Sequence, residues 1–245
     1  MSDGPLIAET LLSPNRRART RAIDTVTIHH AACVGASAAD VARLFLDPAR
    51  RASSNYCIGT AGEIVLCVPE AEAAMTSSSA ANDGRAVTIE VANCGGAPDW
   101  PVSDAAMEAL AALCADICRR NGIDRLRWQG DKALVGQTGL QNMTVHRWFA
   151  QTACPGDYLY NRMGEIASAV NARLAAPQRV DRLADAPDWA RPTLRRLLLA
   201  GCLRGTGGTD EAGLPAGLDL SADMLRLLVV LERAGAFRAL TEQSG

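Results

Sequence analysis

The sequence is short of several kinds of residue, and each shortage excludes a class of protein. Aromatic side chains make up 4% of the 245 residues, and histidine occurs three times. No apolar run reaches the length of about 18 residues that a membrane-spanning helix needs, so we expect no membrane span. The formal net charge is −2 and basic stretches are short. We therefore expect no nucleic-acid binding through a charged surface.

Two further signals are missing. The N-terminal residues MSDGPLIAETLLSPNRRARTRA lack the basic segment followed by an apolar segment that marks a secretory signal. The eight cysteines are scattered and none forms a Cys-x-x-Cys pair. In a protein made in a reducing cytoplasm, such cysteines are mostly small buried hydrophobes, and Cys154 is the exception argued below.

What is present predicts an α/β fold. The length of 245 residues suggests one large domain, or one domain with a small appendage, and an apolar content of 48% is enough for a hydrophobic core. Alternating β-branched residues predict strands, and apolar residues at helical spacing predict helices. The expected elements are strands over 24–29 and 86–92, a hairpin over 55–68, and helices over 37–47, 103–120 and 157–174. Their order predicts a mixed central β-sheet flanked by helices.

The composition changes near residue 175. Residues 175–186 are small, polar and proline-bearing, which is typical of a linker. Two short amphipathic helices follow, over 189–201 and 221–235, with a glycine-rich loop between them. The predicted divisions are therefore an N-terminal extension (1–22), a main domain (23–174), the linker, and a C-terminal helix-loop-helix module (187–245). So small a module should dock on the main domain, on a second copy or on a polymer.

Two predicted strands share an unusual pattern. In TVTIH, alternation places His29 on the polar face, and in VTIEVA it places Glu90 on the polar face. If the strands are neighbours, the two side chains lie on the same face of the sheet. The same alternation places His30 with the aliphatic residues, which predicts a structural role for it.

A second motif supplies two more candidate ligands. His146 and Cys154 lie eight residues apart in VHRWFAQTACPG. Two imidazoles and one thiolate can fill three corners of a zinc tetrahedron and leave the fourth for water. The sequence therefore predicts a catalytic zinc site formed by His29, His146 and Cys154.

Four motifs together resemble a known family. TIHHAA, SSNYCI, VTIEVAN and VHRWFAQTACPG resemble, in this order, segments of the zinc-dependent N-acetylmuramoyl-L-alanine amidases. That family includes phage endolysins and is related to peptidoglycan recognition proteins. The resemblance covers residues 23–174. It implies one Zn²⁺ per chain on the three predicted ligands, with Glu90 as general base. It also implies that Tyr56 lines the catalytic water and that Thr152 stands where some members carry lysine.

The chain also departs from the family pattern. Many relatives have a histidine in the loop before the glutamate-bearing strand, and here that loop reads EAAMTSSSAANDGR. The substrate contacts of that histidine cannot be transferred to this chain. With threonine rather than lysine at 152, the oxyanion would depend more on zinc and on hydroxyl donors.

The resemblance implies a peptidoglycan hydrolase that cleaves the amide between N-acetylmuramic acid and L-alanine. We expect a phage or prophage endolysin or an autolysin, made in the cytoplasm and acting on the cell wall after release by a holin or lysis. One alternative is a non-catalytic peptidoglycan-binding protein on the same fold. Others are Cys154 as a papain-like nucleophile, and a structural zinc with Cys33 as fourth ligand.

The C-terminal module has a resemblance of its own. The residues W-A, an aliphatic helix, G-x-x-x-G-T-G and L-D-L-S-x-D-M-L-R resemble a single divergent S-layer-homology-like repeat. This resemblance implies wall binding. The aliphatic faces of its helices would alternatively serve packing or a homodimer.

Overall fold

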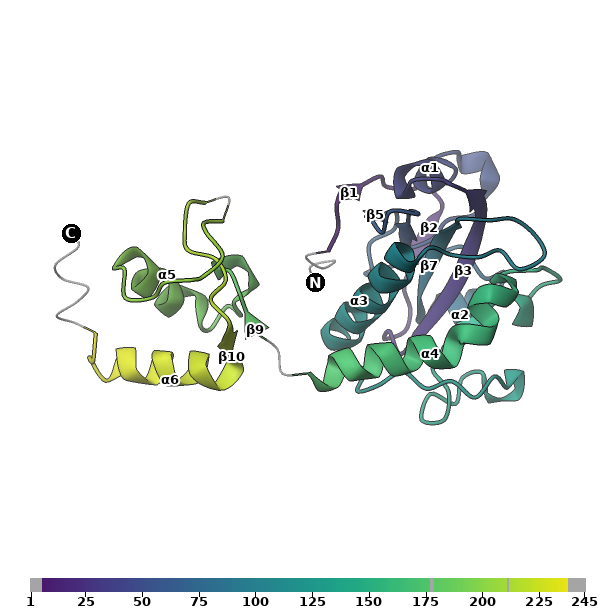
Figure 1. Ribbon diagram of the computed structural model, residues 1–245. Coiled ribbons are helices and arrows are strands. Elements are labelled where there is room, and N and C mark those ends of the chain that lie inside the picture. The colour runs from purple at the N-terminus through teal and green to yellow at the C-terminus, as the bar shows by residue number, and fades with distance from the viewer. Residues whose placement is uncertain (1–5, 177–178, 211, 238–245) are drawn as a thin grey trace. The chain divides into compact units, whose positions relative to one another are not determined.

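The computed structural model describes residues 6–176, 179–210 and 212–237 (Figure 1). The chain divides into two compact units between residues 175 and 176. This division lies where the sequence composition changes. No helix in the described part of the chain is both long enough and apolar enough to cross a membrane.

A six-stranded sheet, ordered β1-β5-β4-β7-β3-β8, forms the centre of the first unit. The neighbours pair in parallel except β4 and β5, which form the antiparallel hairpin predicted over 55–68. The predicted mixed sheet is therefore confirmed. Its strands are β1 (Glu9–Thr10), β3 (Thr25–Val34), β4 (Tyr56–Ile58), β5 (Ile64–Leu66), β7 (Ala86–Asn93) and β8 (Met143–Val145). β8 lies outside the strands that were predicted from the sequence.

Helices flank this sheet on both faces. They are α1 (Ala38–Arg43), α2 (Ala80–Asp83), α3 (Asp104–Arg120) and α4 (Gly156–Ala175), with 3₁₀ turns η1 (Pro48–Arg50), η2 (Lys132–Leu134) and η3 (His146–Trp148). α1 begins with a capping box between Ser37 and Asp40, and the Ser103 hydroxyl caps α3. α3 and α4 pack on one face of the sheet and α1 packs on the other (Figure 1).

Alternation along the strands separates two kinds of side chain. Ile28, Tyr56 and Ile89 are fully buried in the core beneath α3 and α4. Their neighbours His29 and Glu90 point to the opposite face, because successive strand residues alternate. The polar face predicted from the sequence therefore lies on the α1 side of the sheet.

Residues 6–22 are part of this unit, which corrects the predicted extension over 1–22 for the residues that the structure describes. β1 pairs with β5 at the edge of the sheet, and β2 (Arg16–Ala18) pairs with β6 (Glu72–Ala74). Ser13 is fully buried, and its hydroxyl donates to the Phe45 carbonyl at 2.6 Å. The segment has little alternation or helical periodicity, and both backbone pairing and the Ser13 side chain hold it to the rest of the unit.

The second unit has its own apolar core. Its elements are β9 (Arg179–Val180), η4 (Leu183–Asp185), α5 (Arg191–Leu199), β10 (Leu220–Ser221) and α6 (Ala222–Arg233). The Ser221 side chain caps α6, and the two helices pack around Leu194, Leu198 and Val229. β9 pairs with β10, so part of the predicted linker belongs to this fold instead.

One face of α6 carries exposed apolar side chains. Met224, Leu227 and Val230 are 45%, 57% and 61% exposed. A homodimer through this face stays a prediction, as does the S-layer-homology-like resemblance.

Candidate active site

The three predicted metal ligands meet at one end of the central sheet. His29 pairs in register with Glu90 across the parallel strands β3 and β7. His146 follows β8 directly, on the other side of β3, and Cys154 precedes α4. The carboxyl ends of parallel strands are where α/β folds place their sites. The structure therefore brings together residues that are up to 125 positions apart in the sequence.

The ligand atoms of His29, His146 and Cys154 all lie within 4.8 Å of one another. The Cys154 Sγ lies 3.4 Å from His29 Nδ1. In a zinc tetrahedron with Zn–S of about 2.3 Å and Zn–N of about 2.05 Å, that edge is about 3.6 Å long. The donor set and this Cys154–His29 distance therefore fit zinc. Among the described residues this is the one His, Cys, Asp or Glu group of three with such spacing.

Burial shifts the pKa values of all three candidate ligands. His29 is fully buried, and burial together with the nearby His146 lowers its pKa well below the usual value. Both imidazoles are therefore neutral at pH 7, since burial lowers the pKa of His146 as well. Burial raises the pKa of the Cys154 thiol well above its usual value, and Glu90 adds to that rise. The thiol would lose its proton when a cation binds.

Glu90 lies beside the ligands without being one of them. Its Oε1 is 3.9 Å from His29 Nδ1, and its Oε2 is buried with no hydrogen-bond partner among the described residues. Burial raises the pKa of this carboxyl to about 8. A nearby dication would lower that pKa again, because it favours the charged carboxylate. A carboxylate oxygen without a hydrogen-bond partner, next to three candidate metal ligands, is suited to accept a proton from water.

Arg147 holds the two halves of the second motif together. Its guanidinium donates to the Ala153 carbonyl at 2.6 Å and pairs with Asp157 at 3.1 Å. Its backbone N–H donates to the Cys154 carbonyl at 3.1 Å. These contacts close the loop from 148 to 153 and keep the thiol near His146, which gives the eight-residue spacing a structural reason.

Ser78 is a site residue that the sequence did not indicate. Its Oγ lies 3.2 Å from His146 Nε2, and it adopts a left-handed backbone conformation with φ of 63°. The Asp83 carboxylate holds the preceding residues by accepting from the backbone N–H groups of Thr76 and Ser77. With Nε2 so engaged, His146 has Nδ1 left for a metal. In the sequence, the one hint of this contact was that the loop lacks the histidine found in many relatives and is rich in serine instead.

A polar network supports the floor of the site. Thr27 on β3 and Thr144 on β8 share a hydrogen bond of 2.8 Å, and Asn82 of α2 bonds to both. All three side chains are buried. Their hydrogen bonds fix the strands that carry His29 and His146, since a buried polar network tolerates few arrangements.

The structure corrects the expectation for Tyr56. It pairs with Ile89 rather than with Glu90, so its ring points into the core on the far side of the sheet. It is fully buried, and its hydroxyl donates to Glu70 at 2.8 Å. Because side chains alternate along a strand, Cys57, which pairs with Glu90, lies on the polar face and its neighbour Tyr56 lies on the opposite face.

The Tyr56→Phe variant should accordingly keep kcat within about twofold of the parent protein. It should lose about 1 kcal/mol of unfolding free energy, because Glu70 loses one of its donors. Urea unfolding and turnover, measured on the same preparation, check both values. A loss of turnover without a loss of stability would return Tyr56 to the mechanism.

The remaining predicted residues lie around the ligand group. Thr152 is exposed, and its Oγ1 accepts from the Cys154 backbone N–H at 3.2 Å, so its own hydrogen stays available. His30 is buried, with its Nδ1 3.2 Å from Asn93 Oδ1 and its ring against Trp100. Cys33 donates to the Ala31 carbonyl and is not among the three residues of the metal group.

Comparison with known families decides the relationship. The profile of the family described as N-acetylmuramoyl-L-alanine amidase matches residues 19–157, which include every residue of the site. The chain belongs to this amidase family. It is therefore a peptidoglycan amidase, as the four sequence motifs implied. A comparison with curated proteins found no match.

Solved structures show the same fold as this amidase. A mutant endolysin from Bacillus subtilis is 17% identical, with a TM-score of 0.50, and the match covers 67% of this chain and 99% of that one. The E90A mutant of PlyL is 13% identical, with a TM-score of 0.51, and the match covers 68% and 98%. At these identities the likeness supports the fold alone, and it confirms the mixed α/β architecture.

Proposed function

We propose that the chain is a zinc-dependent amidase that hydrolyses the bond between N-acetylmuramic acid and L-alanine. The observation that carries this proposal is the buried His29–His146–Cys154 group with Glu90 beside it. One zinc ion held there would supply a Lewis acid and lower the pKa of water towards about 7. The protein would be a phage or prophage endolysin or an autolysin, and it would reach the cell wall after release from the cytoplasm.

The chain's own residues supply the proton transfers and the orientation. The Glu90 carboxylate accepts the proton of the attacking water and passes it to the departing amine nitrogen, which lets the C–N bond break. The Thr152 hydroxyl can donate to the oxyanion, a contact typically worth about 3 kcal/mol of barrier. Arg147 and Ser78 keep Cys154 and His146 in place.

Three alternatives have less support. A papain-like Cys154 needs one imidazole as its base, whereas two imidazoles, His29 and His146, have ring nitrogens within 4.8 Å of this thiol. A structural zinc needs a fourth protein ligand, and none joins the three within the described part of the chain. A binding protein without activity would have no use for Glu90 in this position.

Muropeptide mass spectrometry tests the proposed bond and the metal together. Purified protein should release fragments with new L-alanine amino termini from cell walls, and a chelator should stop the release. Added Zn²⁺ should restore it. New reducing sugar ends would instead show glycosidase activity. Activity that survives complete zinc removal would contradict the metal assignment.

The Ser78→Gly variant should bind zinc about 10–100-fold more weakly, the usual effect of losing an outer hydrogen bond to a metal ligand. Glycine keeps the positive φ, so the variant removes the hydroxyl without backbone strain. Competition with a chromogenic chelator measures the affinity. Ser168→Ala, which removes a hydroxyl bonded within α4, is the matched control and should bind zinc as the parent does.

A further inference from the structure

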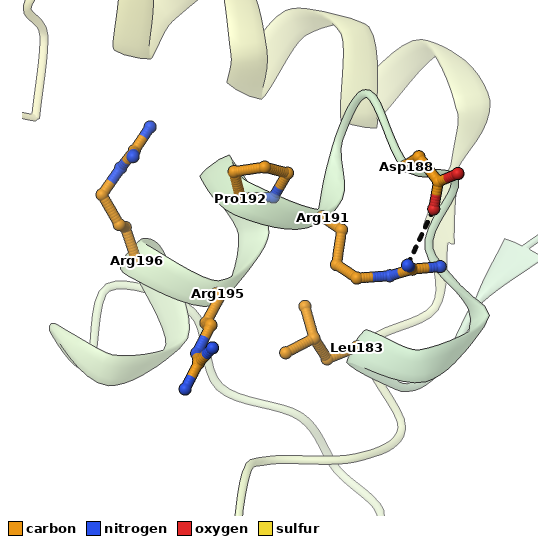
Figure 2. A pocket seen from close by; sticks show the side chains of 6 residues that line it. All are labelled: Leu183, Asp188, Arg191, Pro192, Arg195 and Arg196. Atoms are coloured by element: carbon orange, nitrogen blue, oxygen red, sulfur yellow. Dashed lines mark hydrogen bonds and ion pairs between the residues drawn. The ribbon is translucent and has the colours of Figure 1, made fainter.

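The second unit contains a groove that the amidase reaction does not use. The groove has a volume of about 490 Å³ and is lined by Leu183, Asp188, Arg191, Pro192, Arg195 and Arg196. Figure 2 shows the Leu183 side chain between those of Arg191 and Arg195, beneath α5. The groove therefore combines a small apolar surface with guanidinium groups.

The exposed side of α5 is strongly basic. Leu194, Leu197 and Leu198 are buried against the core of this unit, which leaves the arginines on the outer face. The helix sequence RPTLRRLLL has three arginines and no acidic residue. The hydrophobic core of the unit does not use that charge, because the arginines lie on the exposed side of the helix and these three leucines on the buried side.

Two of the three arginines already bind a carboxylate. Arg191 pairs with Asp188 at 2.7 Å and also donates to the Ala186 carbonyl (Figure 2). Arg196 pairs with Glu232 of α6, whose other oxygen accepts from Thr193. Each pair matches the planar guanidinium to a carboxylate.

Arg195 differs from both neighbours. It has no hydrogen bond or ion pair to any residue in the described ranges 6–176, 179–210 and 212–237, although it lines the same groove. Its five N–H donors stand next to Leu183 and Pro192. A ligand that fits these neighbours has a carboxylate for the guanidinium and a small aliphatic group for the apolar wall.

We propose that this groove binds the carboxylate of an alanine-bearing stem peptide of peptidoglycan, with Arg195 as the recognising residue. The assignment rests on the proposed function, which supplies the polymer. Stem peptides repeat along the wall, so a weak contact at one site adds to the hold of the catalytic unit through effective concentration. The second unit would thereby retain the amidase on its substrate between cuts.

Arginine Nε–Hε NMR signals of the full-length ¹⁵N-labelled protein test the site directly. The Arg195 signal is assigned from its absence in Arg195→Lys. Alanyl-alanine should shift this signal at millimolar concentration, whereas alanyl-alanine amide, which lacks the carboxylate, should not. Inorganic phosphate reports the rival ligand, a phosphate-bearing wall polymer. A shift with phosphate but not with the dipeptide overturns the proposal, and so does the absence of any shift.

Sedimentation with purified cell walls tests the consequence, in a Glu90→Gln background that limits digestion. Arg195→Ala should weaken wall binding about tenfold, in line with the loss of one of two linked contacts. Arg226→Ala is the control, because Arg226 lies on α6 and pairs only with the exposed Asp223. Equal binding by Arg195→Ala and the parent overturns the proposal. Hydrolysis of a soluble muropeptide by proteins that retain Glu90, the parent and Arg195→Ala, shows separately whether the proposed amidase function holds.

Discussion

The Glu90→Gln variant should lose about 10²–10⁴-fold in kcat while it still binds one zinc per chain. This is the range that a positioned general base contributes to a hydrolytic reaction. Glutamine has nearly the same shape as glutamate but cannot take a proton from water. The zinc ligands stay intact, because Glu90 lies 3.9 Å from His29 and is not one of the three metal-group residues. Turnover of a soluble muropeptide, with metal content from the same sample, checks both parts.

The controls separate catalysis from damage to the fold. Glu165→Gln removes an exposed carboxylate on α4 and should leave kcat unchanged. The thermal midpoint of Glu90→Gln should not fall, since the substitution removes a buried charge whose Oε2 has no partner in the described structure. Unchanged turnover in Glu90→Gln would remove this residue from the mechanism. A loss of zinc would instead place its role in the metal site.

The group of three candidate metal ligands, His29, His146 and Cys154, was the most predictable part of the site. Strand alternation separated His29 from His30, and the parallel register then paired His29 with Glu90 as the matched patterns suggested. The signal was strong because the period of two leaves only two choices for each side chain. Applied to β4, the same rule places the Tyr56 side chain in the core, whereas the motif resemblance had placed it at the site.

Contacts between loops were beyond sequence reasoning. Ser78 reaches His146 through a left-handed turn held by Asp83, and no periodic pattern marks such a turn. Likewise, β1 joins the sheet with two residues, which are too few to show alternation. These features depend on which distant segments meet, and the parallel topology decides that. The strongest local patterns therefore predicted which candidate site residues lie together, and the supporting contacts required the fold.

The Cys154→Ala variant should lose both zinc and turnover. The substitution removes one of the three proposed zinc ligands. Zinc affinity should therefore fall by more than the factor of about 10–100 that is lost when only a hydrogen-bond partner of a ligand is removed. The fold should persist, because Arg147 still donates to the Ala153 carbonyl and pairs with Asp157. Chelator competition, turnover and circular dichroism on one preparation measure the three properties.

Cys33→Ala is the matched control, and it separates the rival roles of zinc. Cys33 is a half-buried thiol four residues after His29, and it bonds only to the Ala31 carbonyl in the described structure. If zinc is catalytic, this variant keeps both metal and activity. If zinc is structural with Cys33 as a ligand, the metal is lost. If Cys154 acts as a nucleophile instead, Cys154→Ala retains zinc, and thiol alkylation rather than chelation stops the parent protein. The two variants and two inhibitors therefore give a different pattern for each mechanism.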